Sequence, residues 1–175
     1  MTAPPAGSET GALLSTLNAQ RRHVLGILDG LPDADLRRPV LPSGWTCLGL
    51  VRHLALDVER FWFRRIMAGQ PEDADVPGAA EEPGTDAWEV GQEVPAQAVL
   101  DLYRREIELA DAIIAVTPID TPPAWWPGDR FGSFRLADLR AVLLHVIAET
   151  ACHAGHLDAV RELIDGRLWL DLRSP

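Results

Sequence analysis

Four long segments of this chain repeat apolar residues every three to four positions, the spacing of an amphipathic helix, and Pro and Gly gather between them. The segments cover about residues 8–29, 43–69, 95–117 and 133–165, and the last of them begins near either Ser133 or Leu136. A helix of this kind is stable only when its apolar face is buried against another element. Because no other stretch reads as a long strand, the pattern predicts an all-α four-helix bundle.

Residues that typically begin or end helices lie at the boundaries of these segments. Gly30 ends the first segment, and either Ser43 or Thr46 can cap the start of the second. Pro95 fits the first turn of the third segment, and Gly166 can supply the left-handed conformation that closes the fourth. These signals support the helix boundaries independently of the apolar pattern.

The connections between the segments suggest the order of the helices. Residues 70–94, which are acidic and rich in Pro and Gly, and residues 118–132 read as irregular surface excursions. The first is long enough to cross the bundle, which favours an up-down-down-up order with a long crossover between helices two and three; a simple up-and-down order stays open. With 47% hydrophobic residues, we expect one domain over residues 1–175 with its core in about 8–166.

Charge and composition exclude several classes of partner. The net charge is −10, and a protein that binds nucleic acid or an anionic membrane needs clustered positive charge instead. No secretory signal and no apolar run of membrane-spanning length is visible, so we expect a cytoplasmic protein. The two cysteines, Cys47 and Cys152, are too few for a disulfide framework, and each is expected to be a small buried hydrophobe.

The fourth segment carries a ladder of groups that can bind a metal or a substrate. His145, Glu149 and His153 are spaced four residues apart, so they lie on one helix face, and His156 follows close by. A Glu and a His at this spacing can hold one divalent cation. The alternative is a row of solvated side chains that binds nothing.

The second segment can complete such a site. His53 is followed one turn later by Asp57, which either orients the imidazole through its other nitrogen or is a solvated carboxylate. Facing helices of a bundle bring such groups together. Spacing alone leaves both the metal site and the solvated ladder open.

Residues in the same two segments resemble those of a known superfamily. The runs SGWT at 43–46, GLVRHL at 49–54 and ERFW at 59–62 are similar to the second helix of the DinB-like superfamily, and residues 145–166 are similar to its last helix. The resemblance spans about residues 13–166 and is strongest to a branch known as a domain of unknown function. The superfamily also includes mycothiol-dependent maleylpyruvate isomerases and bacillithiol S-transferases.

The resemblance implies a metal site and a class of reaction. The positions that match the superfamily's ligands are His53, Glu149 and His153. The implied metal is divalent, with Zn²⁺ as the first expectation and Ni²⁺ or Mn²⁺ as alternatives. Three protein ligands leave a coordination position for water or a thiolate, as in catalytic sites. His156, His145 and Asp57 are then the candidates for a catalytic role.

The implied reaction is transfer of a low-molecular-weight thiol of the mycothiol type to a small electrophile. The chain ends soon after the fourth segment, so the extra domain of the maleylpyruvate isomerases is not expected here, nor is isomerase activity. The alternatives are a non-catalytic, stress-related bundle that binds a metal or ligand, and a hydrolase using zinc-bound water. We expect a small-molecule substrate, and the superfamily often forms homodimers.

Overall fold

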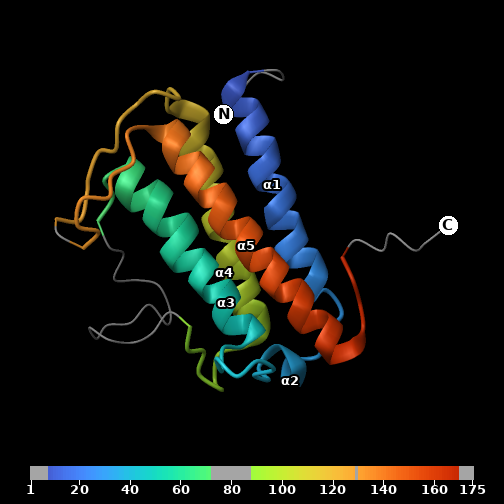
Figure 1. Ribbon diagram of the computed structural model, residues 1–175. Helices are drawn as coiled ribbons and strands as arrows, with labels where there is room; N and C mark the ends of the chain where they lie inside the picture. The colour runs from blue at the N-terminus through green and yellow to red at the C-terminus, as the bar shows by residue number, and fades with distance from the viewer. Residues whose placement is uncertain (1–7, 72–87, 129, 170–175) are drawn as a thin grey trace.

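The computed structural model describes residues 8–71, 88–128 and 130–169, and every regular element in these ranges is a helix (Figure 1). The predicted all-α bundle is confirmed. Within the same ranges, none of the helices combines the length and the apolarity that crossing a bilayer requires.

The first helix, α1 (Glu9–Leu28), begins and ends as its sequence predicts. The Ser8 side chain accepts a hydrogen bond from the Gly11 backbone N–H at 3.0 Å, which satisfies one of the unpaired amides of the first turn. Gly30 follows the helix with a φ of 77°, a conformation that costs glycine nothing. The predicted connector after it contains a short helix, α2 (Asp33–Leu36), that the apolar pattern was too brief to indicate.

Helix α3 (Cys47–His53) begins at Thr46, which settles the choice that the sequence left open. The Thr46 hydroxyl oxygen accepts a hydrogen bond from the Gly49 backbone N–H at 3.0 Å. The helix then continues without a break into η1 (Leu54–Met67). His53 is therefore the last residue before the hydrogen-bond pattern changes.

The η1 segment is a π-helix rather than the α-helix that the sequence predicts. At its end the Ala68 N–H bonds to the Phe63 carbonyl, five residues back, at 3.0 Å. Trp62 lies nine positions after His53, which is about two turns of a π-helix but two and a half turns of an α-helix. The π-helix therefore brings Trp62 onto the same face as His53, where an α-helix would direct it away.

The two remaining long helices are α4 (Ala96–Val116) and α5 (Leu139–Asp165). Pro95 occupies the N-cap position of α4, one residue before the first turn where the sequence placed it. Helix α5 begins at Asp138, whose side chain accepts the Ala141 N–H, and so starts later than predicted. The Asp138 carboxylate is negatively charged and accepts this bond at the positive end of the helix dipole, which favours a helix start at Asp138 over a start at Ser133.

Helices α1 and α5 lie side by side and run in the same direction (Figure 1). At one end of the pair, Glu9 accepts hydrogen bonds from the Arg140 guanidinium at 2.6 and 3.0 Å. At the other end, the Arg167 guanidinium donates to the Asp29 carbonyl at 2.6 Å. The first turns of α1 and α5 therefore lie together at one end of the pair, and their last turns lie together at the other end.

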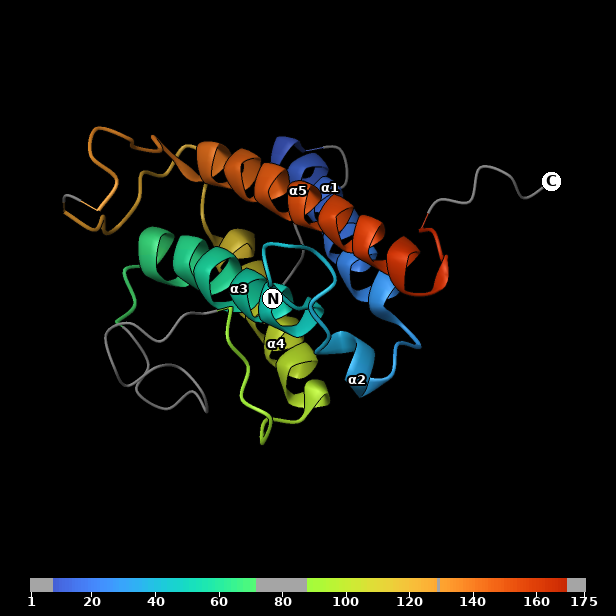
Figure 2. The same ribbon diagram turned by 60° about the horizontal axis from the view of Figure 1, so that its bottom comes forward.

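The α3–η1 rod and α4 form a second pair that also runs in one direction (Figure 2). The rod runs opposite to α5, because His53 contacts His153 while the later Trp62 contacts the earlier His145. Apolar side chains of all these helices form one continuous buried cluster between the pairs. The rod and α5 thus present their polar residues to each other along one seam.

Candidate metal and substrate site

Two histidines from different helices meet across the seam between α3–η1 and α5. The imidazole rings of His53 and His153 lie 5.1 Å apart, centroid to centroid, at an angle of 76°. Both side chains are mostly buried, at 17% and 13% exposure. The contact joins the two sequence segments that were predicted to supply metal ligands.

Asp57 fixes the orientation of His53. Its Oδ2 lies 2.9 Å from Nδ1 of His53, one turn earlier on the same rod. A carboxylate accepts, so Nδ1 carries the proton and Nε2 keeps its lone pair. This is how protein carboxylates commonly prepare an imidazole for a metal.

Glu149 lies one turn before His153 on α5. Its Oε2 is 3.7 Å from Nε2 of His153, and its side chain is 41% exposed. Burial, and secondarily the neighbouring His53, lower the pKa of His153 from 6.5 to about 4. His153 is therefore neutral at pH 7, with a lone pair available as a ligand.

The chemistry of these donors fits a divalent metal, although they do not form a closed coordination sphere as they stand. Two imidazole nitrogens and one carboxylate are a set that Zn²⁺ takes in catalytic sites. In the ranges that the structure describes, no group of three His, Cys, Asp or Glu side chains is arranged to hold an ion. Glu149, the most exposed of the three candidates, is the side chain with the most freedom to move.

A cavity of about 340 Å³ opens beside His53 and Glu149. Four of its lining residues are aromatic, and polar groups of the seam line it as well. The lining residues are His53, Asp57, Val58, Phe61, Trp62, Arg130, Phe131, Phe134, His145 and Glu149. We call this space the aromatic cavity; its size is within the range of small-molecule sites.

The three candidates for a catalytic role occupy different positions. His145 lines the aromatic cavity and packs against Trp62 at 4.5 Å, and burial lowers its pKa. Asp57 acts on His53, as described above. His156 is exposed and lies beside His153, with 3.5 Å between their Nδ1 atoms, and it does not line the cavity.

Several site residues were not predicted from the sequence: Trp88 and Phe131 lie in the predicted excursions, and Phe134 lies just after the second one. Trp88 stacks on His53 at 4.3 Å and lies 5.7 Å from His153. Phe131 and Phe134 wall the aromatic cavity. The available signal was the presence of large aromatic side chains in otherwise polar, Pro-rich and Gly-rich stretches. Residues 72–87 of the first excursion lie outside the described residues.

The two cysteines differ, which corrects one prediction. Cys47 is buried as expected, and burial raises the pKa of its thiol to about 11. Cys152 is exposed rather than a buried hydrophobe, because it lies two positions from both of the buried residues Thr150 and Ala154 and so points away from the core on α5. Neither thiol lines the aromatic cavity.

Comparison with known proteins identifies one family. A family model described as mycothiol-S-transferase matches residues 12–166. No curated protein and no solved structure gives a significant match to the chain.

Proposed function

This chain belongs to the mycothiol S-transferase family, a DinB-like family, and from that premise we propose that it is a metal-dependent enzyme transferring a mycothiol-type thiol to small electrophiles. The observation that carries the proposal is the contact between His53, which lines the aromatic cavity, and His153 of the facing helix. Together with Glu149, they are the residues that would hold the metal. Zn²⁺ is the proposed ion.

A bound divalent metal would lower the pKa of a thiol toward neutrality and so supply a nucleophile at pH 7. The residues of the chain would prepare the site around it. Asp57 holds the imidazole of His53 in one tautomer, and burial keeps His153 neutral. Neutral His145 in the cavity wall is the group placed to accept a proton or a hydrogen bond.

The aromatic cavity supports an apolar or aromatic electrophile. Phe61, Trp62 and Phe131 contact one another with ring centroids 5.2 to 5.9 Å apart, which forms a stiff apolar wall. In the proposed reaction the thiol sulfur forms a bond to an electrophilic carbon. The bond from that carbon to its leaving group breaks, the leaving group takes the electron pair, and the thiol proton passes to the solvent.

The proposal is tested by following thiol transfer to 1-chloro-2,4-dinitrobenzene by absorbance, using zinc-loaded protein with mycothiol. Wild type should turn over only when the thiol is present. Glu149→Ala should lose about a hundredfold or more of the rate, as expected when a ligand is removed. Glu162→Ala, which removes an exposed carboxylate from the same helix, should retain the wild-type rate.

Two other outcomes would replace the proposal. Hydrolysis of an activated ester without any thiol would favour the zinc-water hydrolase. Bound metal without turnover for mycothiol, bacillithiol or cysteine would favour a binding bundle with no catalytic role.

A further inference from the structure

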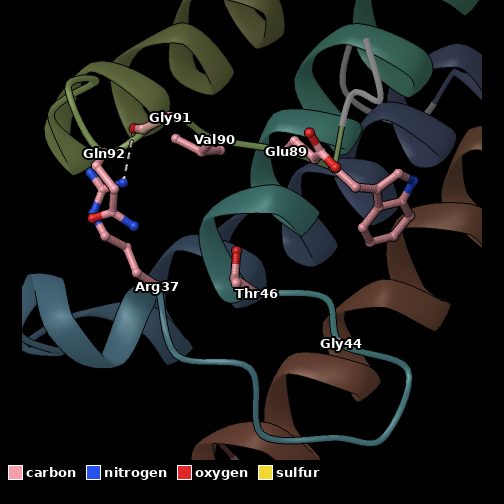
Figure 3. Close-up of a pocket in the computed structure, with 8 residues that line it drawn as sticks. Arg37, Gly44, Thr46, Glu89, Val90, Gly91 and Gln92 are labelled. Atoms are coloured by element: carbon pink, nitrogen blue, oxygen red, sulfur yellow. Dashed lines mark hydrogen bonds between the residues drawn. The ribbon is translucent and has the colours of Figure 1, made fainter. Parts of the chain in front are cut away.

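A second cavity of about 340 Å³ lies near the start of α3, between the end of α2, the loop before α3 and residues 88–92 (Figure 3). Its lining residues are Arg37, Gly44, Thr46, Trp88, Glu89, Val90, Gly91 and Gln92. We call it the polar cavity. Figure 3 shows Thr46 and Gly44 on the α3 side and Glu89 to Gln92 along the facing segment.

The polar cavity adjoins the candidate metal site through a shared wall. Trp88 lines the polar cavity, and its indole stacks on His53 with an interplanar angle of 17°. His53 in turn lines the aromatic cavity. A ligand in the polar cavity would therefore contact Trp88, and a ligand in the aromatic cavity would contact the histidine on which Trp88 stacks.

The lining of the polar cavity is suited to a neutral ligand with many hydroxyl groups. The Glu89 carboxylate and the Gln92 amide make no hydrogen bond to any other described residue, so they can accept from and donate to a ligand. The Thr46 hydroxyl accepts from Gly49 and keeps its own proton to donate. Arg37 and Glu89 carry opposite charges, so the lining has no excess of positive or negative charge that would select an anion or a cation.

Two arginines hold the wall of this cavity in place. Arg37 donates to the Gly91 carbonyl at 3.1 Å and to the Val94 carbonyl, and Arg52 donates to the Glu89 carbonyl at 3.3 Å. The backbone of the facing segment is thus tied to residues before and within α3. A cavity fixed in this way costs less ordering entropy when it binds a ligand.

We propose that the polar cavity is the subsite for the hydroxyl-rich body of the thiol co-substrate, while the electrophile occupies the aromatic cavity. The inference rests on the proposed function, because it assumes that the sulfur is directed toward His53. The body of mycothiol is a glucosamine–inositol unit, which is neutral because its amine is acylated and which carries hydroxyl groups throughout. Its recognition would fall to Glu89, Gln92 and Thr46, with Trp88 at the junction.

The test is a calorimetric titration with glucosaminyl-inositol acylated on nitrogen by acetate, which lacks the thiol and so requires no catalysis. Wild type should bind it, and Glu89→Ala/Gln92→Ala should weaken binding about tenfold or more through the loss of at least one hydrogen bond to a charged group. The matched control is Glu93→Ala/Gln97→Ala, which also removes one exposed carboxylate and one exposed amide. These residues do not line the cavity, and the control should bind as wild type does.

A kinetic arm separates this inference from the proposed function. In the transfer assay, the Glu89→Ala/Gln92→Ala variant should raise the KM for mycothiol about tenfold or more. Its rate with N-acetylcysteine, which has no sugar body, should be unchanged. Normal transfer with an unchanged KM for mycothiol would overturn the subsite and leave the proposed function standing. Sugar binding that the variant loses, in a protein without transferase activity, would support the cavity and sink the proposed function.

Discussion

At the scale of single residues, the Asp57 carboxylate decides which nitrogen of His53 is available. The 2.9 Å contact occupies Nδ1 and leaves Nε2 as the nitrogen available to a metal, and His53 lines the aromatic cavity. The same pairing occurs elsewhere, where Nε2 of His23 lies 2.8 Å from Asp158. In that second pair the carboxylate contacts Nε2, the nitrogen that stays available in His53, and the His23 ring stacks on Trp169. The first pair has the arrangement that the proposed metal site requires.

Asp57→Asn is expected to weaken zinc binding about ten- to a hundredfold, because the amide supports the imidazole less well as a ligand. The measurement is competition with a chromophoric chelator. Asp158→Asn changes the matching carboxylate of the other pair and should leave zinc affinity unaltered. Equal weakening by both substitutions would show that the effect is one of general stability.

At the scale of elements, the contact between the start of α3 and the segment that follows residue 87 depends on Gly49. A Cβ added at Gly49 would lie 2.1 Å from the Trp88 carbonyl oxygen, a backbone atom that cannot move aside cheaply. The absence of a side chain therefore allows Trp88 to reach His53. This glycine links the polar cavity to the candidate metal site.

Gly49→Ala is expected to displace Trp88, to lower the melting temperature and to raise the KM for mycothiol. Gly155→Ala is the matched control, because its Cβ would meet nothing within 4 Å in the middle of α5. The control should be neutral or stabilise the protein by up to about 1 kcal/mol, the usual gain in a helix. Thermal unfolding and transfer kinetics measure both effects. Wild-type behaviour of Gly49→Ala would contradict the role of this close contact.

The elements also show which features a sequence can predict. The Gly166 stop follows from local chemistry and is found where it was expected, and Thr46 is one of the two caps that the sequence left open. The π-helix was missed because apolar spacing does not encode the hydrogen-bond register of η1. Trp88 was missed because its contact with His53 joins residues far apart in the chain. The spacing of Glu149 and His153 predicted that they share one face of α5. The position of His53 relative to them depends on how the helices pack, which the sequence does not show.

At the scale of the whole molecule, a buried ion pair ties the two helix pairs together. The Arg21 guanidinium of α1 donates to both oxygens of Glu59 in η1, at 2.7 and 2.6 Å, and also to Asp111 of α4. Arg21 and Glu59 are both almost fully buried. Burial raises the pKa of Glu59, although Arg21 opposes the rise. Such a pair costs much desolvation but fixes how the helices face each other.

Arg21→Met is expected to destabilise the protein by about 3–5 kcal/mol in urea unfolding at pH 7, because it leaves the Glu59 charge buried without a partner. The deficit should shrink as the pH falls toward 5. Without Arg21, the pKa of Glu59 in the folded state rises further above its value in the unfolded state. As the pH falls, the folded variant therefore takes up a proton at Glu59 before the unfolded chain does, which restores part of its stability. Arg21→Met/Glu59→Met should recover most of the loss. A double variant no more stable than Arg21→Met would contradict this account.

The most direct test of the central claim is the metal content of the purified protein, measured by elemental analysis after zinc loading. We expect about one equivalent in wild type and in His23→Ala, the control histidine. His53→Ala, Glu149→Ala and His153→Ala should each lose the metal while keeping the helical circular-dichroism spectrum. If wild type holds no metal after loading with zinc, nickel or manganese, or if the three variants retain it, the metal site is wrong.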